Sequence, residues 1–194
     1  MTYDKFSDQM LIDAFVAGDK RGIEVLIQRY KEKVYSYILL NVKNPSVADD
    51  IFQDTFVKVM SSLHSRSYSD EGKFLSWIMR IAHNLVIDYY RYEKNNGQTS
   101  CDENDFVLNS TSLADSTVED SMVESQILSD VRKLLDYLPP EQKEVIMLRH
   151  YGGMSFKEIA DVTNVSINTA LGRMRYAILN LRRIVDEKKI ILTK

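Results

Sequence analysis

Apolar residues recur at three- and four-residue spacings along most of the chain, and no stretch sustains the alternation of apolar and polar residues that is typical of a strand. Helix-breaking residues are few, since the chain contains 7 Gly and 3 Pro. The pattern therefore predicts an all-α protein.

Four helices are predicted in the first half of the chain. Ser7 can cap a short helix that ends at Gly18, and a longer helix spans about 20–42 and ends at Asn44-Pro45. Ser46 offers the N-cap of a third helix, and a fourth spans about 73–92. The residues expected to face inward are Ile23, Leu26, Ile27, Tyr30, Val34, Tyr37 and Ile38 in the second helix, Ile51, Phe52, Phe56, Val59, Met60 and Leu63 in the third, and Phe74, Trp77, Ile78, Ile81, Leu85 and Tyr89 in the fourth.

Residues 96–116 are rich in Asn, Ser, Thr, Asp and Glu, and their few apolar residues follow no period. Such a segment cannot bury enough surface to offset the entropy cost of ordering it. We therefore expect a flexible linker at 96–116 between two small helical domains, 1–95 and 117–194.

The distribution of charge agrees with this division. Residues 1–97 carry 13 basic and 13 acidic side chains, residues 98–130 carry 0 and 8, and residues 131–194 carry 12 and 7. The overall net charge of -3 thus conceals a basic C-terminal segment, which is compatible with nucleic-acid binding.

The C-terminal half is also predicted to be helical. Ser116 and Glu119 have the spacing of a capping box, and the helix that they begin runs through Leu134 and Leu138 to Pro139-Pro140. Pro140 can open the next helix, which spans about 141–151 and stops at two glycines.

Residues 156–175 fit a helix-turn-helix. A second capping box, Ser155 with Glu158, begins the first helix, and Asn164 occupies the turn, where Asn tolerates the left-handed conformation. The second helix begins after Ser166. This spacing favours DNA binding, although a helical hairpin that merely packs is the alternative.

The second helix of this motif has a polar outer face. The residues expected to face inward are Ile167, Ala170, Met174, Ala177, Ile178 and Leu181. Arginine and asparagine on the outer face can bind base edges and phosphates, and a glycine there permits close backbone approach. The candidate DNA-binding residues are Asn168, Thr169, Gly172, Arg173, Arg175, Tyr176 and Arg183. A solvated charged face would explain the arginines but not the glycine and tyrosine among them.

Two further groups of polar residues lie in the first half. Asp49, Asp50, Gln53 and Asp54 share the face opposite the apolar stripe of their helix, which suits either a basic partner or plain solvation near a helix N-terminus. The 73–92 helix is expected to present Arg80, His83, Tyr90 and Arg91 outward, after a loop that contains Tyr68. Cations interleaved with aromatic rings suit single-stranded DNA.

Three segments together resemble the extracytoplasmic-function branch of the sigma-70 family. Residues 48–56 (ADDIFQDTF) look like its polymerase-binding signature, residues 74–91 like its promoter-melting helix, and residues 138–149 with the helix-turn-helix like its -35-binding region. The resemblance implies a sigma factor that binds the beta-prime clamp helices and beta flap of core RNA polymerase, opens promoter DNA, and is restrained by an anti-sigma factor.

Roles for individual residues follow from the resemblance. It implies polymerase binding by Asp49, Asp50, Gln53, Asp54 and Phe56, contacts to the -10 element by Ser67, Tyr68, Ser69, Arg80, His83, Asn84 and Arg91, and contacts to the -35 element by the seven candidates of the helix-turn-helix. The chain departs from the family pattern at Leu171, Gly172 and Tyr176, which leaves fewer cationic contacts to phosphate.

Other classes of function have less support in the sequence. The single cysteine, Cys101, and the three scattered histidines form no metal-ligand spacing, and no glycine-rich phosphate loop or activated nucleophile is present. No signal peptide or membrane-length apolar run is evident. We therefore expect a cytoplasmic protein without cofactor, metal or enzymatic activity, and the alternative is a helix-turn-helix regulator that acts without polymerase.

Overall fold

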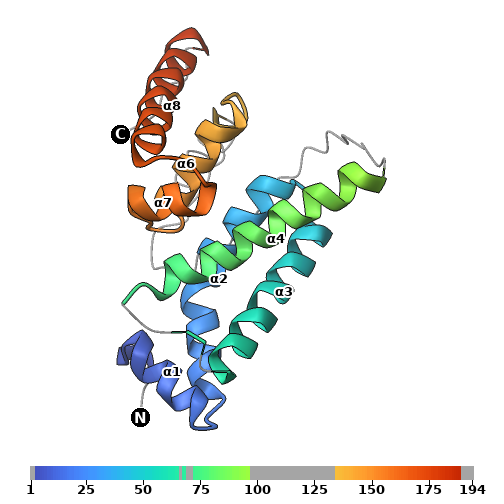
Figure 1. Ribbon diagram of the computed structural model, residues 1–194, viewed down its shortest axis with the longest axis vertical. Helices are drawn as coiled ribbons and strands as arrows, with labels where there is room; N and C mark the ends of the chain where they lie inside the picture. The colour runs from blue at the N-terminus through green and yellow to red at the C-terminus, as the bar shows by residue number, and fades with distance from the viewer. Residues whose placement is uncertain (1–2, 66, 69–71, 97–133, 189–194) are drawn as a thin grey trace, which may run out of the picture. The chain divides into compact units, whose positions relative to one another are not determined.

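The computed structural model describes residues 3–65, 67–68, 72–96 and 134–188. The described part contains seven α-helices and one short 3₁₀ helix, with no strand, so the prediction of an all-α fold is confirmed. The elements are η1 (Tyr3–Lys5), α1 (Asp8–Val16), α2 (Arg21–Val42), α3 (Pro45–His64), α4 (Phe74–Asn96), α6 (Pro140–His150), α7 (Phe156–Thr163) and α8 (Ile167–Lys188) (Figure 1).

The described residues fall into two compact units. The first contains α1 to α4 and residues 147–167, and the second contains residues 134–146 and 168–188. Residues 97–116 of the predicted linker and the Ser116–Glu119 capping box lie outside the described residues, while Asn96 is the last residue of α4, so the predicted domain limits stay a prediction.

Local capping explains where the first helices begin. The side chain of Ser7 accepts a hydrogen bond from the Met10 amide at 3.3 Å, as the sequence predicts. The predicted cap at Ser46 is wrong, because Asn44 caps α3 by accepting from the amides of Ser46 and Val47 at 3.0 and 3.3 Å. Pro45 then occupies the first turn, where its missing amide hydrogen leaves no partner unsatisfied.

Helices α1 and α2 pack so closely that only glycine fits at one position. A Cβ atom on Gly22 would lie 2.3 Å from the carbonyl oxygen of Leu11. Hydrogen bonds also hold the start of α1 against α2, since the Asp8 carboxylate accepts from Arg29 and from the Tyr30 hydroxyl, each at 2.5 Å. Burial and this bond raise the pKa of Tyr30 to about 12.

The core of α1 to α4 largely follows the predicted stripes. The buried residues of α2 and α3 include Ile23, Leu26, Val34, Tyr37, Ile38, Ile51, Phe56, Val59 and Leu63. In α4, however, the buried face is rotated from the predicted one. Its buried residues are Phe74, Ile78, Met79, Ala82, His83 and Val86, whereas Trp77, Ile81, Leu85 and Tyr89 are half-buried.

The C-terminal helices agree with the prediction in part. Pro140 opens α6, as predicted. Leu134, Leu135 and Leu138 are buried, but the predicted continuation of the preceding helix to Leu138 is wrong, since its helical residues end at Leu135. In α8 the buried residues are Ala170, Ala177 and Ile184, one every second turn. The inward placement of Ile167 and Ile178 is wrong, since these side chains are 45% and 43% exposed.

Candidate nucleic-acid and partner interfaces

The acidic face of α3, made of Asp49, Asp50, Gln53 and Asp54, is exposed along its whole length. The helix places it there because Ile51, Thr55 and Val59 occupy the buried side. Burial and a hydrogen bond to Asp49 raise the pKa of Tyr35 on the neighbouring helix. The face therefore presents three carboxylates to solvent or to a basic partner.

Phe56 belongs to the core instead of this face. Its side chain is 4% exposed, and its ring centroid lies 4.9 Å from that of Phe52. The sequence motif names Phe56 together with the acidic residues, but a side chain buried in this way contributes by shaping the helix and not by touching a partner.

Helix α4 exposes Arg80, Asn84 and Arg91, which lie on one side of the helix at spacings of four and seven residues. Arg91 also forms an ion pair with Asp88 at 3.3 Å, which is solvent-exposed and so contributes little to stability. Two cations and an amide thus line this surface, and the outward placement of both arginines agrees with the prediction.

The outward placement of His83 is wrong. Its side chain is 5% exposed, and its Nδ1 atom lies 2.9 Å from the hydroxyl oxygen of the buried Tyr37. Burial lowers the pKa of His83, because the charged imidazolium loses hydration. Tyr90 is half exposed, and its hydroxyl donates to the carbonyl of Asn41 at 2.5 Å.

Tyr68 in the loop before α4 belongs to an aromatic cluster of tilted and edge-on rings. Its ring centroid lies 4.3 Å from that of Trp77 and 5.5 Å from that of Phe74. Ser67 is exposed and its hydroxyl donates to the carbonyl of Ser62 at 3.1 Å, whereas Ser69 lies outside the described residues. The sequence predicts Trp77 in the core, but the ring is half-buried and supports Tyr68.

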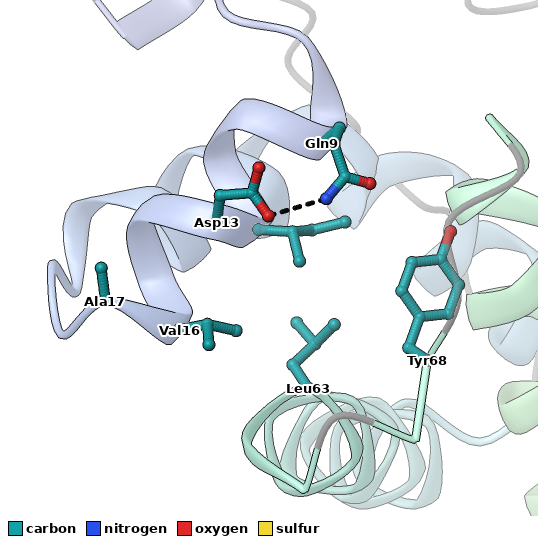
Figure 2. A pocket seen from close by; sticks show the side chains of 7 residues that line it. Gln9, Asp13, Val16, Ala17, Leu63 and Tyr68 are labelled. Atoms are coloured by element: carbon teal, nitrogen blue, oxygen red, sulfur yellow. Dashed lines mark hydrogen bonds between the residues drawn. The ribbon is translucent and has the colours of Figure 1, made fainter.

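A pocket opens between α1, the end of α3 and Tyr68 (Figure 2). Its volume is about 500 Å³. Ile12, Val16 and Leu63 supply apolar lining, while Gln9 and Asp13 supply polar groups. Sequence reasoning missed the α1 residues, because a short amphipathic helix carries no signal that it borders a site some fifty residues away.

The helix-turn-helix has the predicted local geometry. The Ser155 hydroxyl accepts from the Glu158 amide, and the Glu158 carboxylate accepts from the Ser155 amide at 2.8 Å, which completes the capping box. Asn164 ends α7 in the left-handed conformation, with φ 53° and ψ 48°. Helix α8 follows after two residues, at Ile167.

The outer face of α8 is polar, with one open position. Asn168, Thr169, Arg175, Tyr176 and Arg183 are exposed, and Gly172 and Arg173 are partly exposed. No atom lies within 4 Å of the point where a Cβ on Gly172 would stand, so packing does not require a glycine there. Burial raises the pKa of Glu144, and the charge of Arg173 opposes that shift.

Two family descriptions match separate parts of the chain. "Sigma-70 region 2" matches residues 26–96, and "Sigma-70, region 4" matches residues 128–173. The ECF RNA polymerase sigma-E factor of Haemophilus influenzae is 27% identical over 190 residues, which cover 95% of this chain and 96% of the relative. The chain is an extracytoplasmic-function sigma factor. It therefore binds core RNA polymerase and directs promoter-specific initiation of transcription, and a regulator that acts without polymerase is not favoured.

Other relatives of the sigma factor cover it almost completely. The RNA polymerase sigma-H factor of Pseudomonas aeruginosa is 24% identical, with 93% of this chain and 92% of the relative covered. The ECF RNA polymerase sigma-E factor of Escherichia coli K12 is 25% identical, with 95% of each covered. Sigma factors as a family are initiation factors without enzymatic activity.

Solved structures share the fold of the sigma factor. The structure of CnrH in complex with the cytosolic domain of CnrY gives a TM-score of 0.63 at 23% identity, over 94% of this chain and 99% of that one. The sigma factor RpoE of Bartonella quintana, in complex with the anti-sigma factor NepR, gives 0.64 at 18% identity, over 84% and 96%.

Two kinds of feature are absent from the described residues of the sigma factor. No helix in this part of the chain is long and apolar enough to cross a membrane. Within the same ranges, no group of three or more His, Cys, Asp or Glu side chains is arranged to hold a metal ion.

Proposed function

We propose that the sigma factor uses three separate surfaces to bind core polymerase, the -10 element and the -35 element. The acidic face of α3 docks on the clamp helices of core polymerase, the exposed side of α4 with Tyr68 holds the opened -10 element, and the outer face of α8 reads the -35 element as duplex. The exposure of each polar set on its own helix is the observation that carries this division. The protein would act in the cytoplasm, where polymerase and chromosome are, and would catalyse no reaction.

Charge supports the docking surface. Three exposed carboxylates within six residues repel one another, and a basic partner surface relieves that repulsion. Reversing two of them, in the variant Asp50→Lys with Asp54→Lys, should weaken the complex with core polymerase at least tenfold while helicity stays unchanged. The matched control is Glu24→Lys with Glu32→Lys, which changes net charge equally on exposed sites of α2. Unchanged affinity of the α3 variant, or equal loss in the control, would remove the assignment.

Stacking supports the -10 surface. Unpaired bases stack on aromatic rings while cations meet their phosphates, and Tyr68 lies on the same helix-loop unit as Arg80 and Asn84. Tyr68→Ala and Asn84→Ala should impair strand opening, measured by permanganate reactivity of unpaired thymines, while recruitment is retained. A pre-melted promoter should partly rescue both variants. A loss of recruitment that pre-melting does not restore contradicts the role in opening.

The polar face of α8 suits a major groove. Arg175 is exposed beside Gly172, where the groove can approach the helix backbone. Arg175→Ala should reduce the slope of log K against log salt for promoter binding by about one unit, as the loss of one phosphate contact does. Lys33→Ala, an exposed cation on α2, is the control and should leave the slope unchanged. Pre-melting the promoter should not rescue Arg175→Ala.

The proposal includes the domain limits, with domains at 1–95 and 117–194 joined by a linker at 96–116. Because residues 96–116 are polar and acidic, limited proteolysis should cut there first and release two folded fragments, and preferential cutting inside 1–95 or 117–194 contradicts these limits.

The solved structures named above contain sigma factors bound to partners, one of them an anti-sigma factor, and we expect this sigma factor to be restrained in the same manner. Affinity capture from its own organism, followed by inhibition of transcription in vitro by the captured protein, tests this.

A further inference from the structure

Two large apolar side chains are exposed near the start of α8, in the part of a helix-turn-helix that faces base edges. Ile167 and Leu171 are the first and fifth residues of the helix, and their side chains are 45% and 44% exposed. Side chains four residues apart are neighbours on one side of a helix. The two residues therefore form one apolar patch, in contrast to the single exposed apolar residues that are common on protein surfaces.

Polar side chains and open backbone surround Leu171. Asn168 precedes it by three residues and Arg175 follows it by four, so both are its neighbours on the helix surface, and both are exposed. Gly172 is the next residue, and no atom lies within 4 Å of the point where its Cβ would stand. Leu171 therefore lies in the middle of the surface that is proposed above to read the -35 element.

The charges around the patch favour duplex DNA as its occupant. Residues 167–185 contain four arginines and no acidic residue, a composition that suits phosphates on either side of a groove. Arg175 and Arg182 are exposed on the same side of α8 as the patch. A second copy of the chain on this face would bring these arginines close to their own counterparts, and the repulsion of like charges opposes that arrangement.

The side chain of Leu171 has no donor or acceptor, so its contact with a base edge is apolar. In the major groove, the 5-methyl group of thymine is the apolar group that side chains can contact. The donors and acceptors of the other base edges would lose their hydrogen bonds to water, without replacement, under a leucine. The chemistry of the patch therefore favours thymine at the base pair that Leu171 faces.

We propose that Leu171, with Ile167 beside it, contacts the 5-methyl group of a thymine in the -35 element and so selects thymine at one position. The inference rests on the proposed -35 function of α8 and adds the base and the residue that chooses it. Leu171 is also one of the positions at which the chain departs from the family pattern, so this contact would be a property of this chain.

Deoxyuridine, which lacks only the 5-methyl group of thymidine, tests the proposal in the complex of the sigma factor, core polymerase and duplex promoter. The preferred -35 sequence is first selected from duplexes randomised in that element, and each thymine is then replaced in turn. At one thymine, deoxyuridine should weaken binding about fourfold, as the loss of one buried methyl group does. At the same position, 5-methylcytosine should bind more tightly than cytosine by a similar factor. In Leu171→Ala, both ratios should fall below roughly twofold, because alanine covers little of the methyl group.

The matched control is Leu179→Ala, which truncates another exposed leucine of α8 eight residues farther along and should keep both ratios. If deoxyuridine weakens binding equally in the wild type and in Leu171→Ala, another residue reads the methyl group and the inference is wrong. A loss of affinity for core polymerase in Leu171→Ala, with both ratios unchanged, would assign the patch to a protein partner and would also overturn the inference.

Arg175→Ala separates this inference from the function on which it rests. If no thymine responds to deoxyuridine while Arg175→Ala still weakens promoter binding, α8 reads the -35 element without the apolar contact, and only the inference fails. If neither Leu171→Ala nor Arg175→Ala changes promoter binding, the proposed -35 function itself fails.

Discussion

Replacing Gly22 with alanine should destabilise the first unit by pushing α1 away from α2. The added Cβ would stand 2.3 Å from the Leu11 carbonyl oxygen and 3.0 Å from the Phe15 amide nitrogen. Both are backbone atoms, so a rotamer change cannot relieve the contact and α1 must shift by about 1 Å. Overpacking of this kind costs roughly 1–3 kcal/mol. Alanine in place of a helical glycine recovers up to about 1 kcal/mol. The net expected loss is about 1–2 kcal/mol.

The single tryptophan makes this loss measurable in the full chain. Trp77 lies in α4, so its fluorescence reports unfolding of the unit that contains Gly22. The midpoint of thermal unfolding should fall by roughly 5–15 °C, given that 1 kcal/mol shifts a domain of this size by about 4–8 °C. The matched control is Gly172→Ala, where no atom lies within 4 Å of the added Cβ. An unchanged midpoint in Gly22→Ala would show that the close approach of α1 and α2 does not constrain this position.

Three further predictions concern other positions. Gly172→Ala should stabilise α8 by up to about 1 kcal/mol in denaturant unfolding yet weaken -35 binding, and undiminished binding would argue against a close backbone approach to DNA. The pKa of His83 is lower in the folded protein than in the unfolded chain, so the unfolded chain takes up a proton first as the pH falls. The free energy of unfolding should therefore decline as the pH falls through about 6.5, and this decline should be smaller in His83→Gln. Ser155→Ala should cost α7 about 1 kcal/mol by removing the capping box, measured by chemical unfolding, whereas Ser65→Ala, at the end of α3, should cost less.

Much of the fold could be predicted because its determinants are local. The cap at Ser7, the capping box at Ser155 and the left-handed Asn164 each depend on residues within four positions, and all three are present. The stripes of α2 and α3 were also predictable, since aliphatic and aromatic residues make up most of them, although the polar Thr55 is buried among them. The exposed acidic face of α3 follows directly from that stripe.

The errors arose where packing overrides residue type. In α4, polarity suggested that His83 faces outward, but a partner hydroxyl on Tyr37 makes its burial acceptable. In α8, small alanines form the buried seam and leave larger neighbours such as Ile178 exposed, which a ranking by hydrophobicity cannot foresee. Asn44 and Ser46 are equally good caps by type, and the position of Pro45 decided between them. The pocket could not be predicted because its lining comes from two segments that are far apart in sequence, α1 and the end of α3 with Tyr68.

The family match to region 2 begins at residue 26, yet the hydrophobic interior begins earlier. Leu11 and Phe15 of α1 are 0% and 6% exposed, and Asp8 is tied to Arg29 and Tyr30. A fragment cut at the start of the family match, or a chimera joined there, would uncover the side of α2 that these residues shield. A chimera that exchanges this segment between sigma factors should therefore include the first 25 residues. Without them, the chimera would expose an apolar surface that promotes aggregation.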